Sequence, residues 1–222
     1  MDNLETIIEQ IRSELEQMND VRDATLERSR TLIRHCANAI KAVHRRQWEQ
    51  ARAGLETARS AAREMMEEAQ AYPELYYSGF TQDALKEYVE AFVIYALVHG
   101  GPLPTPEELG VEGPAYLNGL AEAASELRRT VLDIMRHDRQ DEAERHLDAI
   151  DTIYNDLMTF DFPDAVTHGL RRRVDALRGV LERTRGDLTT SLRQQRLREA
   201  LERVERHLAQ AGQAPDGDED GR

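Results

Sequence analysis

The sequence predicts an all-α protein, an antiparallel bundle of about six to seven long helices. Long segments are rich in Ala, Leu, Glu and Arg, only 7 Pro and 13 Gly occur among 222 residues, and aromatic residues make up 5%. This balance favours helices over strands. No segment alternates apolar and polar residues for long enough to require a strand. We therefore expect one helical domain over residues 1–210 and an acidic, disordered tail over residues 211–222.

Apolar spacing and helix-breaking residues place the individual helices. The first helix follows from the four-three spacing of Leu4, Ile8, Ile11 and Leu15, and the second is ended by Pro73. Thr105-Pro106-Glu107-Glu108 has the pattern of a short capped helical turn. The long helices are expected over residues 4–45, 47–71, 74–99, 114–136, 138–158 and 164–210. Candidate breaks lie at Ser78-Gly79 and near Gly186.

The helix over residues 114–136 divides into two sides. Its apolar side is predicted to carry Leu117, Leu120, Ala121, Ala124, Leu127 and Val131. The opposite side is predicted to carry Asn118, Gly119, Glu122, Ser125, Glu126 and Arg129. Because long helices with apolar residues on more than one side need further neighbours, we also expect the chain to assemble with copies of itself.

Composition excludes several classes of protein. The sequence has no run of 18 or more apolar residues and no basic-then-apolar signal peptide, so we expect a cytoplasmic protein with no membrane partner. The single Cys36 cannot form an intrachain disulfide. There is no phosphate-binding Gly-rich loop, His-Glu-x-x-His motif or serine elbow. The seven histidines, His44 among them, are scattered and are interpreted as surface or core-edge residues.

Positive charge is concentrated in two zones of this acidic chain, whose formal net charge is −13. Residues 28–52 have a local balance of +6 and residues 164–198 one of +5. Two such zones suggest a shielded site for an anion. The candidate residues for contacting such an anion are Arg45, Arg46 and Arg52, followed by Arg34, Arg59 and Arg63. The alternative is that these arginines pair with acids on neighbouring helices.

Two carboxylates stand three positions apart in Leu85-Lys86-Glu87-Tyr88-Val89-Glu90-Ala91. On a helix their Cβ atoms lie about 5 to 6 Å apart on one face. Oxygen pairs of this kind suit hard cations such as Mg²⁺ or Mn²⁺. A solvated stripe is the alternative, because Asp83 and Lys86 extend the same helical spacing. Against it, every position from Ala91 to Val98 is apolar, so the helix must be enclosed just beyond the pair.

Several segments resemble the translin family in order and spacing. They are Tyr76-Tyr77, the Glu87-Tyr88-Val89-Glu90 run, Tyr116-Leu117-Asn118-Gly119-Leu120 with Ser125-Glu126-Leu127, and Arg171-Arg172-Arg173-Val174-Asp175-Ala176-Leu177. The resemblance covers most of residues 20–190. It implies an all-α protomer, a hollow homo-octamer, and binding of single-stranded RNA or DNA in its interior.

The carboxylate run is similar to that of Trax, the branch of the family that cuts single-stranded RNA with Mg²⁺ or Mn²⁺. The resemblance implies that Glu87, Glu90, Glu122 and Glu126 are catalytic, metal-binding carboxylates. Glu122 stands where Trax has an aspartate, which departs from the pattern. The expected function is therefore a metal-dependent endoribonuclease that works as a homo-oligomer. The alternatives are a non-catalytic, translin-like nucleic-acid-binding assembly and a helical scaffold that binds only protein.

Overall fold

The computed structural model describes residues 3–137 and 139–211, and within these ranges the chain forms helices and no strands. The helices are α1 (Leu4–His44), α2 (Trp48–Ala69), α3 (Pro73–Tyr76), α4 (Gly79–His99), α5 (Pro106–Leu109), α6 (Gly113–Met135), α7 (Gln140–Leu157), α8 (Asp164–Thr167) and α9 (Leu170–Ala211). The expected all-α fold is confirmed. The expected acidic tail, apart from Ala211 at the end of α9, lies outside the described residues.

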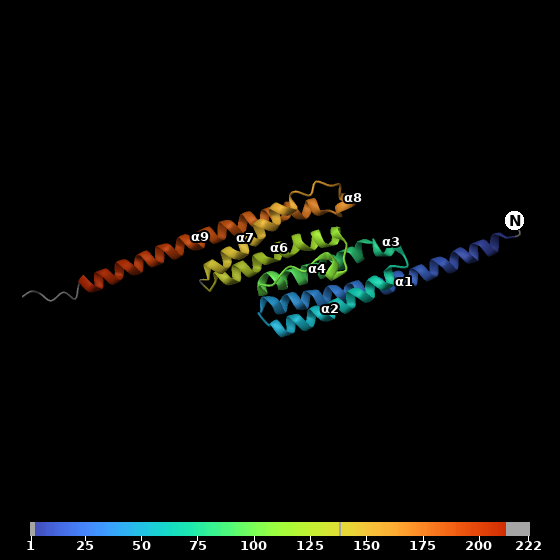
Figure 1. Ribbon diagram of the computed structural model, residues 1–222, viewed down its shortest axis with the longest axis horizontal. Coiled ribbons are helices and arrows are strands. Elements are labelled where there is room, and N and C mark those ends of the chain that lie inside the picture. Colours follow the sequence, from blue (N-terminus) through green and yellow to red (C-terminus); the bar gives the residue numbers. More distant parts are fainter. Residues whose placement is uncertain (1–2, 138, 212–222) are drawn as a thin grey trace, which may run out of the picture.

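The long helices lie side by side in an elongated bundle (Figure 1). α1 packs against α2 and α4, α4 packs against α6, and α6 packs against α7 and α9. α4 and α6 therefore form the middle of the bundle. Both are lined with small or apolar buried residues on several sides, as expected for helices that have neighbours on more than one face.

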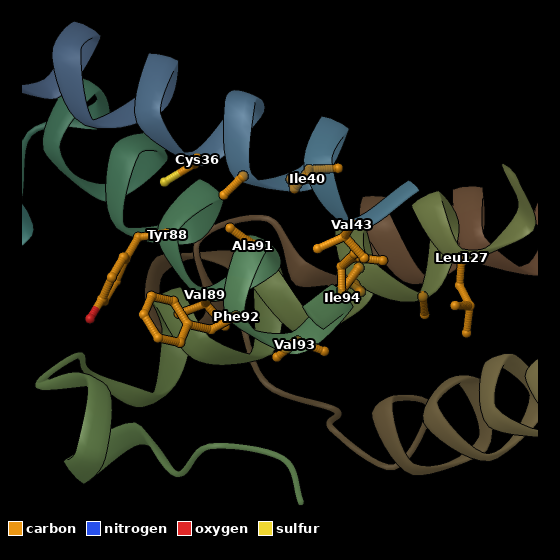
Figure 2. Packing of buried hydrophobic residues seen from close by; sticks show 14 of the residues in the cluster. Cys36, Ile40, Val43, Tyr88, Val89, Ala91, Phe92, Val93, Ile94 and Leu127 are labelled. Atoms are coloured by element: carbon orange, nitrogen blue, oxygen red, sulfur yellow. The ribbon is translucent and has the colours of Figure 1, made fainter. Parts of the chain in front are cut away.

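The core is centred on α4. Cys36, Ile40 and Val43 of α1 face the labelled apolar residues of α4, and Leu127 of α6 lies beyond them (Figure 2). Gly100 ends α4 with a positive φ of 91°, a conformation that costs glycine little. The short α5 begins with the expected cap: the Thr105 hydroxyl accepts from the Glu108 N–H, and the Glu108 carboxylate accepts from the Thr105 N–H.

Two sequence predictions about the helices are wrong. α9 continues through Gly186 without interruption, and the break falls earlier, where His168 and Gly169 have φ values of 52° and 86°. Asn118 and Gly119 of α6 are buried, although they were assigned to the polar side. The reason is that α6 contacts α4, α7, α8 and α9, so the sides that face α4 and α8 are enclosed as well.

The two ends of the chain project from opposite ends of the bundle. The first turns of α1 extend beyond α2 on one side, and the last turns of α9 extend beyond α7 on the other (Figure 1). In the described part of the chain, no helix is long and apolar enough to cross a membrane.

Candidate functional site

α4 and α6 bring the four candidate carboxylates into one region. Glu87 and Glu90 belong to α4, and Glu122 and Glu126 belong to the adjacent α6. All four side chains are partly buried. Glu90 is influenced by the charges of the other three, as expected for one electrostatically connected group. We call these four residues the acidic site.

Glu90 is the most strongly perturbed member of the acidic site. Burial, and after it the negative charges of Glu87 and Glu122, together raise its pKa to about 8. Burial is also the main reason why the pKa of the neighbouring Cys36 thiol is raised, with Glu87 and Glu90 adding to the effect. At neutral pH and without a cation, Glu90 is therefore mostly protonated.

An ammonium group lies between the two helices of the acidic site. The Lys86 Nζ atom donates to Glu87 Oε1 at 2.9 Å and lies 3.4 Å from Glu122 Oε1. Burial alone would lower the pKa of Lys86. The hydrogen bond to Glu87 and the charges of Glu87 and Glu122 outweigh it, so the pKa is raised and Lys86 stays charged.

Glu122 is anchored from α9. The Arg173 Nε donates to Glu122 Oε1 at 3.1 Å, and the Arg173 Nη1 donates to Asn118 Oδ1 at 3.0 Å. The Asn118 amide in turn donates to the carbonyls of Pro114 and Thr167 at 2.7 and 2.8 Å. This chain of hydrogen bonds fixes Glu122 relative to the start of α6 and the end of α8.

Glu126 is held from the other side of the site by α1. His44 Nε2 lies 2.7 Å from Glu126 Oε1, and His44 Nδ1 lies 3.4 Å from the hydroxyl of Thr130. The hydrogen bond from His44 is the main cause of the lowered pKa of Glu126. Glu126 is therefore ionised at neutral pH, in contrast to Glu90. A cavity of about 340 Å³ beside His44 is lined by Arg45, Arg46 and Arg139, among others.

The acidic site has the donor chemistry of a site for a hard cation, because it offers carboxylate oxygens in a partly buried setting. Burial is the main cause of the raised pKa of Glu90, and the negative charges of Glu87 and Glu122, which add to it, favour a positive charge nearby. Lys86 supplies part of that positive charge. Among the described residues, no group of three or more His, Cys, Asp or Glu side chains is already arranged as a metal site.

The candidate arginines differ in the contacts they make. Arg46, with a φ of 56° at the α1–α2 turn, donates to Glu142 Oε1 at 2.7 Å. Together with Arg139 it lowers the pKa of Glu142 to about 2 in spite of partial burial. The Arg59 guanidinium lies over the Phe92 ring, 4.8 Å from the centroid.

The other candidates project from α1 and α2. Arg45, Arg52, Arg34 and Arg63 are exposed. A hydrogen bond to Tyr95 is the main cause of the raised pKa of Arg52, and the Arg34 guanidinium reaches the Thr31 hydroxyl at 3.5 Å. Arg45, like Arg46, lines the same cavity as His44, the partner of Glu126.

Sequence reasoning missed His44 and Arg173 as partners of the acidic site. His44 was interpreted as a surface or core-edge histidine, yet its side chain is only 4% exposed. Arg173 lies in a segment that resembles the translin family, but no functional role was predicted for it. No local pattern identifies either partner, because each comes from a helix more than 50 positions away along the chain.

Comparisons with known proteins agree with the fold and with the family resemblance. No model of a protein family matches the chain. An uncharacterized protein of Methanocaldococcus jannaschii is 32% identical over 197 residues, covering 88% of this chain and 87% of that protein.

Solved structures are similar as well. The crystal structure of AfC3PO has a TM-score of 0.76 and 34% identity, covering 83% of this chain and 96% of that chain. The complex of AfC3PO with duplex RNA has a TM-score of 0.71 at the same identity and covers 83% and 95%. The apo-NeC3PO structure, at 22% identity and a TM-score of 0.76 over 83% and 96%, shows the fold alone. The chain belongs to the translin family, which includes the C3PO proteins.

Proposed function

We propose that this protein binds RNA as a homo-oligomer, of eight copies by the family resemblance, and cleaves single-stranded RNA with Mg²⁺ or Mn²⁺ at the acidic site. The observation that carries the proposal is the set of four carboxylates between α4 and α6, with the pKa of Glu90 raised to about 8. Perturbed carboxyl groups gathered from two helices are characteristic of functional sites.

RNA as the ligand is supported by similarity to AfC3PO, whose structure is known in complex with duplex RNA. The exposed Arg45 and Arg52 offer positive charge at the end of α1 and the start of α2, in an otherwise acidic chain. Phosphate contacts from arginine provide much of the affinity of such proteins for nucleic acid. The preference for single-stranded over duplex RNA is part of the proposal. The cytoplasmic location expected from the sequence remains a prediction.

Glu87, Glu90, Glu122 and Glu126 would hold the cation. When bound, it would polarise a phosphoryl oxygen and lower the pKa of a water molecule. The residues of the chain prepare for this in three ways. Arg173 fixes the orientation of Glu122, His44 keeps Glu126 ionised, and Glu90 must release its proton before it can act as an anionic ligand.

A non-catalytic RNA-binding assembly is the second candidate, and a specific observation favours it. Lys86 and Arg173 already contribute positive charge to Glu87 and Glu122. In this function the same ion pairs would simply join α4, α6 and α9. The carboxylates would then be structural.

The deciding experiment is incubation of purified protein with a labelled RNA, as a single strand and as a duplex, with Mn²⁺, with Mg²⁺ and with a chelator. The catalytic proposal expects metal-dependent fragments from the single strand and none with the chelator. Retained binding without cleavage under every metal condition would favour the non-catalytic assembly. Neither binding nor cleavage would remove both candidates and favour the protein-binding scaffold.

A further inference from the structure

The two projecting ends of the chain carry apolar surface that the described part of the protomer does not cover. We define the N-terminal arm as residues 4–20 of α1 and the C-terminal arm as residues 193–209 of α9. On the N-terminal arm, Ile7 is 44% and Leu15 58% exposed. On the C-terminal arm, Val204 is 55% and Leu208 67% exposed. Contiguous exposed apolar surface of this kind marks an interaction site, so each arm is expected to have a partner.

The apolar residues of both arms follow the same spacing. Leu4, Ile8, Ile11 and Leu15 are separated by four, three and four positions. Leu197, Leu201, Val204 and Leu208 are separated in the same way. This is the four-three repeat of a two-helix coiled coil, in which each apolar side chain inserts between residues of the facing helix. At 1.5 Å per residue each arm is about 26 Å long, so their apolar seams match in length.

The charges of the arms are opposite. The N-terminal arm has five acidic residues and one arginine, a net charge of −4, and the C-terminal arm has five arginines and three glutamates, a net charge of +2. Pairing of two N-terminal arms or of two C-terminal arms would bring like charges together. Pairing of unlike arms brings opposite charges together, which favours this combination and sets its specificity.

The unlike arms of one copy cannot meet, because they project from opposite ends of the bundle (Figure 1). We infer that the N-terminal arm of one copy packs along the C-terminal arm of a second copy. This inference rests on the self-assembly proposed above and adds the interface that produces it. A contact between unlike surfaces continues from copy to copy until the assembly closes.

The test uses two full-length variants that each lose one arm surface. Variant N carries Ile8→Glu and Ile11→Glu, and variant C carries Leu201→Glu and Val204→Glu. A control adds the same number of acids to the polar side of the N-terminal arm, as Gln10→Glu and Ser13→Glu. Masses are measured by light scattering after gel filtration, without RNA. The wild type and the control should have the same large mass, and variants N and C should each have a smaller one.

Mixing the variants separates unlike-arm from like-arm pairing. Variant N keeps its C-terminal arm and variant C keeps its N-terminal arm, so differently tagged N and C should co-purify. Two differently tagged samples of variant N should co-purify at least tenfold less. Equal co-purification in both mixtures would overturn the inference. If the wild type assembles and both variants keep its full mass, the arm interface is wrong but the assembly stands. If the wild type is a monomer, the proposed assembly is wrong as well.

Discussion

Gly119 of α6 faces Val89 of α4 so closely that a Cβ atom on Gly119 would lie 2.6 Å from the Val89 Cβ and 2.7 Å from the Lys86 carbonyl oxygen. Only glycine fits at this crossing. The crossing also determines how close the carboxylates of α4 and α6 lie, because Val89 directly precedes Glu90 and Gly119 precedes Glu122 by one helical turn. The distance between the two pairs of carboxylates is therefore fixed by the absence of one side chain.

We expect Gly119→Ala to lower the free energy of unfolding by about 1 to 3 kcal/mol, the usual cost of overpacking a core. Denaturant unfolding followed by circular dichroism measures it. The matched control is Gly186→Ala in α9, where nothing lies within 4 Å of an added Cβ. Since Ala is the better helix former, the control should gain about 0.5 to 1 kcal/mol. Equal effects of the two changes would contradict the packing argument.

The pKa of Glu90 predicts how stability depends on pH. Folding raises this pKa from an ordinary 4.5 to about 8, so between these values the folded state binds a proton that the unfolded state lacks. The binding of this proton therefore stabilises the folded state fully below about pH 4.5, and the stabilisation is lost as the pH rises to about 8. Melting temperatures from pH 5 to 9 should fall more steeply for the wild type than for Glu90→Gln. Parallel curves would contradict the raised pKa.

A divalent cation at the acidic site should reverse this loss. A positive charge beside Glu90 favours its ionised form, so Mn²⁺ binding near pH 7 should release a proton and raise the melting temperature. Calorimetry in two buffers of different ionisation enthalpy measures the proton release. Glu90→Gln should release fewer protons, because no carboxyl remains at this position. An unchanged melting temperature with Mn²⁺ would argue against a cation at this site.

Local sequence patterns predicted the helices well, because apolar spacing, Pro73 and the Thr105 cap act over a few residues. They did not predict the burial of Asn118 or Gly119, since that depends on helices that pack against α6 from distant parts of the chain. Glu87 and Glu90 were candidates because of their spacing, and Glu122 and Glu126 because of the resemblance to Trax; their role in metal binding remains a prediction. Their partners His44 and Arg173 were not predicted, because a hydrogen bond between distant helices leaves no spacing signal.

The arginines are expected to divide into two groups. Arg45 and Arg52 are exposed, so the double variant Arg45→Ala/Arg52→Ala should reduce the salt dependence of RNA binding, by about 0.7 in the slope for each lost contact. Fluorescence anisotropy at several salt concentrations measures the slope. The control removes two arginines from α9 that pair with acids, as Arg178→Ala/Arg185→Ala. An equal change in the control would indicate a general charge effect.

Arg46 should behave differently from Arg45, because its guanidinium is engaged with Glu142. Arg46→Ala leaves Glu142 with Arg139 alone, which should raise the low pKa of Glu142 and weaken the contact between the α1–α2 turn and α7. We expect lower stability near neutral pH and little change in the slope of RNA binding against salt. The same unfolding and anisotropy measurements check both parts. A large change in slope with unchanged stability would instead place Arg46 on the RNA.

The carboxylates themselves give the most direct test of catalysis. If they share a cation, Glu87→Ala or Glu90→Ala should abolish cleavage of single-stranded RNA and leave RNA binding and assembly nearly intact, because the charge that stabilises the reaction is lost. Glu182→Ala is a control, since Glu182 is an exposed glutamate on α9. If the glutamates were only an ordinary solvent-exposed polar face of the helix, each of these changes would cost about 0.5 kcal/mol of stability or less and would leave cleavage unchanged.

Glu122 provides the sharper version of this test, because it stands where the Trax pattern has an aspartate. Glu122→Asp should keep or raise the rate of cleavage, whereas Glu122→Ala should lower it. The aspartate variant retains a carboxylate for Lys86 and Arg173, whereas the alanine variant also loses those ion pairs, so the stability of both variants is measured beside the rate. Rates are measured with labelled RNA at saturating Mn²⁺, and RNA binding is measured on the same samples. Equal cleavage by the wild type and both variants would show that Glu122 is not part of the catalytic site. A wild type that binds RNA without cutting it would favour the non-catalytic binding assembly.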